Sequence, residues 1–187
     1  TSPSGPMGIY AVRPDGDGPF PVIVFFHHGP GLDEGSKQTM ARIAEWGYYV
    51  VTHDRYHRAE PWYTMQSRSD DEIKKMFGLV LGTNEDQVAE DLDALLAWLP
   101  SDPAARDGAM GCIGYCIGAR SVLRTLAWHN DLFRVGVALH PSYCTTADDD
   151  SPLAHGADAD RFSADVIVGR RRRLRRRPCP GSRSRHP

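Results

Sequence analysis

A cysteine between two glycines is the sequence feature whose residue types and spacing are best suited to catalysis. Residues 114–118 read Gly-Tyr-Cys-Ile-Gly, between a predicted strand at 109–113 and a predicted helix at about 119–128. A nucleophile elbow has this context, because the chain turns sharply from strand to helix and needs small residues two positions before and after the nucleophile. The pattern therefore predicts that Cys116 is a nucleophile.

Cys116 is expected at the start of a helix, where the helix dipole and the unpaired N–H groups favour the thiolate form. The N–H of Ile117 would then point toward the oxyanion that develops when a carbonyl is attacked. The alternative is a buried cysteine in a glycine-rich turn, since short motifs recur by chance. Cys112, inside the preceding strand, is expected to be a core residue.

A second oxyanion donor is expected from the loop after an early strand. An apolar run typical of a buried strand ends at residues 27–31, which read His-His-Gly-Pro-Gly. Gly29 lets the backbone approach a substrate closely, so its N–H is the predicted donor. His28 has two interpretations: it contacts Cys116 or the substrate, or it braces the loop by hydrogen bonding. His27 is expected to be structural.

Strand-like and helix-like segments alternate along most of the chain. Strands are predicted at 7–13, 20–26, 48–52, 109–113, 135–139 and 165–168, and helices at 36–46, 70–80, 84–99 and 119–128. Continuous apolar runs fit strands that are buried on both faces. The alternation predicts an α/β fold with a doubly wound, mostly parallel sheet.

The composition indicates an acidic globular domain followed by a basic segment. The chain has 187 residues, 41% of them apolar and 25% charged, which is enough for one domain with a hydrophobic core. Nine arginines and no acidic residue occur at 169–187, so the remainder holds 13 basic and 24 acidic side chains. We predict an α/β domain at 1–168 and a disordered arginine-rich tail at 169–187.

No apolar run reaches the roughly 18 residues of a membrane helix, and the N-terminus has no signal-peptide pattern. The four cysteines form no Cys-x-x-Cys pair. These features predict a cytoplasmic protein with reduced thiols and no membrane partner. They give no indication of the oligomeric state.

Several segments occur in an order that matches a known family. They are Tyr-x-x-x-Pro-x-Gly-x-Gly-Pro-Phe-Pro-Val-Ile-Val at 10–24, Gly-Tyr-Tyr-Val-Val at 47–51, Asp-Arg-Tyr at 54–56, Gly-Cys-Ile-Gly-Tyr-Cys-Ile-Gly at 111–118 and Leu-His-Pro at 139–141. The chain resembles the dienelactone hydrolase family over about residues 7–168. The elbow is the most specific element of this resemblance.

The resemblance implies an α/β-hydrolase fold and hydrolysis of small carboxylic esters or lactones, with no cofactor and no metal. Cys116 would attack the carbonyl, an acyl-enzyme would form, and water would release it. The family's namesake enzymes carry an acidic residue where His28 stands, so this chain departs from their pattern there. A glutamine-amidotransferase-like domain would need His and Glu after the elbow in its own pattern, which the sequence lacks.

Elbow hydrolases place their acid and histidine after the nucleophile. The family's spacing puts these residues at about 166 and 196, and the second lies beyond Pro187. Asp165 opens a predicted strand that the acid should follow, and His186 lies in the tail. Three other histidines come too early: His129, His140 and His155. We therefore expect a fold that lacks its C-terminal strand and helix, with activity impaired or lost.

The arginine-rich tail has two explanations. A frameshift near Gly169 would produce it, because a run of CGC arginine codons shifted by one base reads as alanine codons. Alternatively, the tail is an electrostatic arm for nucleic acid or an acidic partner, which would make the protein a non-catalytic binding protein. We favour the frameshift. A small ester or lactone is then the expected partner, and nucleic acid is not.

Overall fold

A computed structural model of the chain describes residues 2–141 and 165–169. Within these residues one six-stranded sheet has the order β1-β3-β2-β4-β5-β6. β1 runs antiparallel to β3, and all other neighbouring strands are parallel. The strands are β1 Ile9–Val12, β2 Val22–Phe26, β3 Tyr49–His53, β4 Met110–Tyr115, β5 Phe133–Leu139 and β6 Asp165–Gly169.

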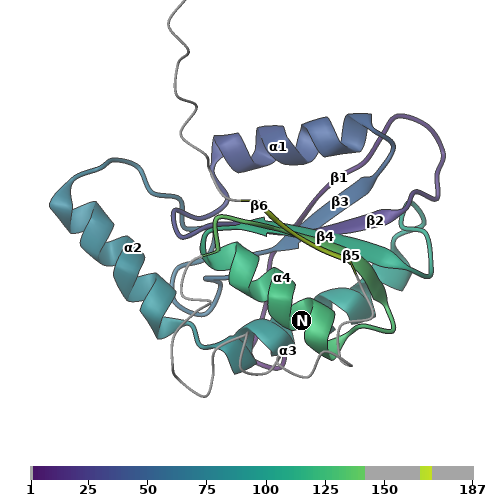
Figure 1. The fold of residues 1–187 in the computed structure, drawn as a ribbon. Helices are drawn as coiled ribbons and strands as arrows, with labels where there is room; N and C mark the ends of the chain where they lie inside the picture. The colour runs from purple at the N-terminus through teal and green to yellow at the C-terminus, as the bar shows by residue number, and fades with distance from the viewer. Residues whose placement is uncertain (1, 142–164, 170–187) are drawn as a thin grey trace, which may run out of the picture.

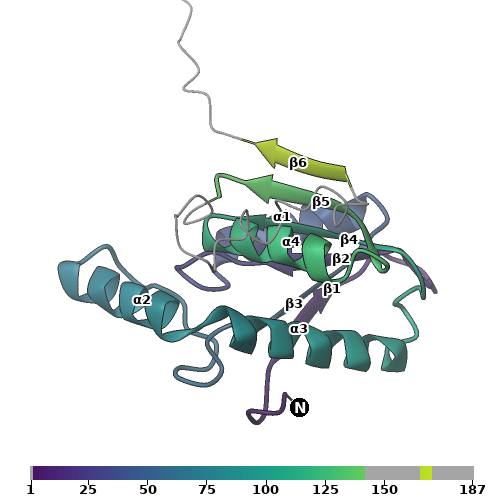
Figure 2. The ribbon, with the colours of Figure 1, turned by 60° about the horizontal axis from the view of Figure 1, so that its bottom comes forward.

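Helices cover both faces of this sheet, as the predicted fold class requires. They are α1 Glu34–Glu45, α2 Asp70–Gly82, α3 Glu85–Trp98 and α4 Ile117–Trp128, with a short 3₁₀ turn, η1, at Leu99–Ser101. α1 lies on one face, and α3 and α4 lie on the other (Figure 1). α2 lies apart from these layers, beyond the edge toward which the parallel strands point (Figure 2). The doubly wound, mostly parallel sheet is confirmed.

The continuous apolar run of β2 is explained by burial on both faces. Val24 and Phe26 belong to the core between the sheet and helices α3 and α4. Phe25, between them in sequence, belongs to the core beneath α1, where it joins Met40. Successive residues of a strand point to opposite faces. The three side chains are at most 4% exposed, so β2 is held firmly and its carboxyl end is a rigid support for the loop that follows.

Polar caps decide where the helices begin. Asp33 is the N-cap of α1, and its carboxylate accepts a hydrogen bond from the Ser36 N–H at 2.8 Å. The helix therefore starts at Glu34, earlier than the predicted position 36. Asn84 and Gln87 form a capping box at the start of α3. The cap of α1 also brings its first turn close to the loop after β2, because Asp33 contacts His28.

Several predictions lie outside the described residues. They concern the disorder of the tail beyond Gly169, the proposed frameshift, and the candidate histidines His155 and His186. The strand predicted at 165–168 is confirmed as β6. None of the helices that the structure describes is long and apolar enough to span a membrane.

Candidate active site

Cys116 lies at the tip of a sharp turn between β4 and α4. Its φ of 59° and ψ of −122° form a backbone conformation that side-chain-bearing residues rarely adopt. It is the N-cap residue of α4, which begins at Ile117 rather than at the predicted position 119. Its own N–H donates to the carbonyl of Leu139 at 3.0 Å. The strained turn is thus anchored to β5.

The two glycines of the elbow are required by backbone contacts. A Cβ on Gly118 would lie 2.2 Å from the carbonyl oxygen of Phe26, and one on Gly114 would lie 2.4 Å from the carbonyl oxygen of Gly118. Backbone atoms at these positions cannot move aside, because they belong to a central strand and a helix. Gly118 therefore lets α4 approach the end of β2 closely.

This approach brings the elbow and the loop after β2 to one pocket of about 750 Å³. The pocket is lined by all four residues that the sequence singled out: His28, Gly29, Cys116 and Ile117. The elbow and the loop after β2 therefore border the same cavity.

The rest of the pocket lining is mainly apolar and comes largely from α2. This helix contributes Ile73, Met76, Phe77 and Val80, and Met65 adds another apolar side chain. Arg68 adds a positively charged side chain to the lining. Phe77 is 43% exposed, which is high for an aromatic side chain. The pocket thus offers an apolar surface to a group attached to the reacting carbonyl.

Tyr56 holds the loop after β2 in place. Its hydroxyl donates to the carbonyl of Gly29 at 2.9 Å, and the residue is 1% exposed. Burial raises the pKa of Tyr56 to about 12, although the charge of Arg55 opposes this shift. The phenol is therefore a neutral donor near the cysteine. The sequence offered Tyr56 only as part of a family motif, since its partner lies 27 residues away.

His28 is braced by a carboxylate. Its Nε2 lies 3.0 Å from Oδ2 of Asp33, and its ring packs against Tyr115 with a centroid distance of 4.8 Å. The Tyr115 hydroxyl shares a hydrogen bond with Ser36. These contacts fit the bracing interpretation of His28, and the residue also lines the pocket, so its contact with Cys116 or the substrate stays a prediction. Asp33 was not predicted from the sequence as the partner of His28. Its position as a helix cap was the signal that could have indicated it.

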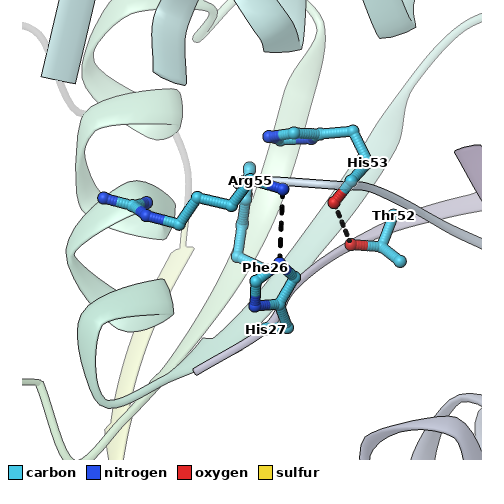
Figure 3. A pocket seen from close by; sticks show the side chains of 5 residues that line it. All are labelled: Phe26, His27, Thr52, His53 and Arg55. Atoms are coloured by element: carbon cyan, nitrogen blue, oxygen red, sulfur yellow. Dashed lines mark hydrogen bonds between the residues drawn. The ribbon is translucent and has the colours of Figure 1, made fainter. Parts of the chain in front are cut away.

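A small cavity behind this loop is lined by Phe26, His27, Thr52, His53 and Arg55 (Figure 3). His27 Nδ1 lies 2.9 Å from the carbonyl of His28, and the Arg55 N–H donates to His27 Nε2 at 3.4 Å. These contacts place the proton of His27 on Nδ1. The structural role predicted for His27 is confirmed.

The side chain of Arg55 ties the end of β3 to the helices beneath the sheet. It donates to Ser121 Oγ at 3.2 Å and lies 3.8 Å from Glu85. Glu85 also pairs with Arg120 at 3.1 Å and with Arg124 at 3.5 Å. This buried ionic cluster fixes the start of α3 against α4, the helix that carries Cys116 at its N-terminus.

The other candidates among the described residues do not line this pocket. Cys112 is 3% exposed, and burial raises the pKa of its thiol, as expected of a core residue. His129 follows the far end of α4 and lies 3.4 Å from Asp93. His140 follows β5. Among the described residues, no group of three His, Cys, Asp or Glu side chains could hold a metal ion.

Replacing Gly118 with alanine should disrupt the elbow. Its Cβ would meet backbone atoms, whereas a Cβ on Gly82, at the end of α2, would meet nothing within 4 Å. We expect Gly118→Ala to lower the free energy of unfolding by more than about 2 kcal/mol. Gly82→Ala should leave it unchanged or raise it by up to about 1 kcal/mol, because alanine has the higher helix propensity. Urea unfolding would measure both. Equal stabilities of the two variants would contradict this geometry.

Acid should destabilise the fold through two of the buried histidines, His27 and His53. Burial lowers the pKa of His27 to about 3 and that of His53 to about 4, from 6.5. The unfolded chain therefore binds more protons below pH 6.5, and stability falls as the pH drops toward 4. Between pH 7 and pH 5, each of these histidines should lower the free energy of unfolding by roughly 2 kcal/mol.

The His53→Phe variant isolates one of these contributions. Its ring can keep the edge contact with Phe26. Urea unfolding at several pH values should show a smaller acid-induced loss for His53→Phe than for the unaltered chain. Two parallel curves of stability against pH would show that His53 does not contribute.

Comparison with known proteins supports this architecture. The family model described as "Dienelactone hydrolase family" matches residues 7–168. A protein provisionally named as a dienelactone hydrolase from Klebsiella pneumoniae subsp. pneumoniae has a crystal structure with a TM-score of 0.66 and 20% identity, covering 87% of this chain and 79% of that one. At this identity the structural likeness concerns the fold.

Curated relatives carry a single type of name. A protein provisionally named as a carboxymethylenebutenolidase from Methylorubrum extorquens is 30% identical over 135 residues, which are 72% of this chain and 44% of the relative. The carboxymethylenebutenolidase of Pseudomonas putida is 25% identical over 100 residues, 54% of this chain and 42% of the relative. The chain spans under half the length of both. With the family model matched across the sheet and the elbow, the chain belongs to the dienelactone hydrolase family.

Proposed function

We propose that this chain hydrolyses small carboxylic esters or lactones with Cys116 as its nucleophile. The observation that carries the proposal is the shared pocket, in which an elbow cysteine at a helix N-terminus lies beside the loop of Gly29. A glycine-flanked turn with a strained nucleophile is costly to maintain. This cost is expected where the geometry serves catalysis.

The chemistry begins with attack of the Cys116 thiolate on the carbonyl carbon of the substrate. The N–H groups of Ile117 and Gly29 donate to the oxygen that becomes negatively charged, and the N-terminal end of α4 stabilises the thiolate. Collapse of the tetrahedral intermediate expels the alcohol and leaves a thioester on Cys116. Water then attacks this thioester, which releases the acid and regenerates the thiol.

The pocket favours substrates with an apolar group next to the ester or lactone. The α2 side chains Met76 and Phe77 line the pocket that contains Cys116. The names of the relatives identify their substrate as a carboxymethylenebutenolide. We propose that this chain likewise acts on an ester or lactone, so its partner is a small-molecule substrate. The reduced, buried thiol of Cys112 fits a reducing compartment such as the cytoplasm.

The family's triad acid, expected after β6, and its histidine, expected further along, fall outside the described residues. A binding protein that uses its arginine-rich tail is not favoured, because the family model and the names of the relatives support a hydrolase.

Mass spectrometry after mixing with p-nitrophenyl acetate tests the nucleophile. We expect one acetyl group on the peptide that contains Cys116, accompanied by release of p-nitrophenol. Cys116→Ala should lose the adduct, and the rate of p-nitrophenol release should fall by at least about 100-fold.

The matched control is Cys112→Ala, which removes a buried thiol from the same region of the chain. It should keep both the adduct and the rate. An adduct of equal yield in Cys116→Ala would refute the proposed nucleophile.

A further inference from the structure

His28 and Asp33 form a pair at the pocket, and the proposed role of Cys116 does not explain why this pair is there. His28 lines the pocket that contains Cys116, and its side chain is 21% exposed, so solvent reaches the ring. Oδ2 of Asp33 lies 3.0 Å from Nε2 of the ring. A histidine that is oriented by a carboxylate and shares a pocket with a nucleophile has the arrangement of a general base.

The hydrogen bond to Asp33 selects the tautomer of His28. A carboxylate accepts only, so the neutral ring carries its proton on Nε2 and keeps the lone pair on Nδ1. Although burial opposes it, hydrogen bonds from Ser36 and the charge of His28 lower the pKa of Asp33. Asp33 is therefore ionised at neutral pH, and Nδ1 is the basic atom of the ring.

The ring is held in position from two further directions. Oδ1 of Asp33 accepts from the Ser36 N–H at 2.8 Å, which fixes the carboxylate at the start of α1. Tyr115, the residue before Cys116, packs against the ring of His28. The orientation of His28 is thus coupled both to α1 and to the elbow, and a base held in this way loses little entropy when it acts.

We propose that His28 is the general base that activates the water for release of the acyl group from Cys116, with Asp33 as its positioning residue. This inference rests on the proposed function. Nδ1 of His28 takes a proton from water while the water oxygen bonds to the thioester carbon. The tetrahedral intermediate then breaks its carbon–sulfur bond, the acid leaves, and the sulfur of Cys116 departs as a thiolate. His28 returns its proton to the thiolate or to solvent.

The titratable groups around His28 are few within the described residues. Asp33 lies beside Nε2, Tyr115 packs on the ring from β4, and His27 precedes it in the loop. Cys116 and Arg68 line the same pocket. Burial lowers the pKa of His27 to about 3, so His27 stays neutral across the neutral pH range.

The test follows the acetyl adduct on Cys116 after excess p-nitrophenyl acetate has been removed. Mass spectrometry then measures the rate of adduct loss across the neutral pH range. In the unaltered chain we expect this rate to rise with pH and level off. His28→Gln and Asp33→Asn should slow it by about 100-fold or more.

Asp33→Asn is the sharper of the two variants. Asparagine keeps an oxygen for the Ser36 N–H, but its amide donates to Nε2 and forces the proton of His28 onto Nδ1. The matched controls are Asp93→Asn and His129→Gln, a second histidine–aspartate pair outside the pocket. Both controls should lose the adduct at the rate of the unaltered chain.

Chemical rescue separates catalysis from a structural role. Added imidazole should restore adduct loss in His28→Ala, which a bracing function alone would not produce. The base assignment is overturned by a stable adduct in the unaltered chain, or by rates within twofold of it in His28→Gln and Asp33→Asn. Neither result would affect the assignment of Cys116 as the nucleophile. Absence of any adduct in the unaltered chain overturns both the nucleophile and the base.

Discussion

The structure depends on one close approach between backbones. The carbonyl of Phe26 at the end of β2 lies so near Gly118 that no side chain fits between them. Because β2 and β4 are neighbouring parallel strands, their carboxyl ends meet at one edge of the sheet. The contact at Gly118 then places the start of α4 directly beside the loop that leaves β2. Cys116 and Gly29 share a pocket for this reason.

Hydrogen bonds from buried side chains keep the loop where this contact puts it. Tyr56 binds the carbonyl of Gly29, and His27 binds the carbonyl of His28. Both side chains are almost fully buried, so water does not compete for these bonds. The carbonyls point into the protein, which leaves the opposite side of the loop to face the pocket. A site built in this way is preorganised by the fold itself.

Local sequence patterns predicted the elements and the elbow well, because both depend on neighbours in the chain. Apolar runs identified the buried strands, and glycine spacing identified the turn at Cys116. Contacts between distant residues were harder to predict: Tyr56 and Gly29 meet only once β2 and β3 pair. The role of Asp33 was missed because the helix was placed from its apolar residues and not from its cap. His28 kept two interpretations, since its neighbours in sequence do not show which groups face its ring.

The central claim is that Cys116 attacks a carbonyl whose oxygen is held by Ile117 and Gly29. A crystal structure of the chain treated with an aldehyde analogue of a small ester tests it most directly, because the aldehyde carbon and a thiolate form a stable tetrahedral adduct. The account predicts a bond from that carbon to Sγ of Cys116, with the adduct oxygen about 3 Å from both backbone nitrogens. An oxygen turned toward solvent, or an adduct on another cysteine, would contradict it.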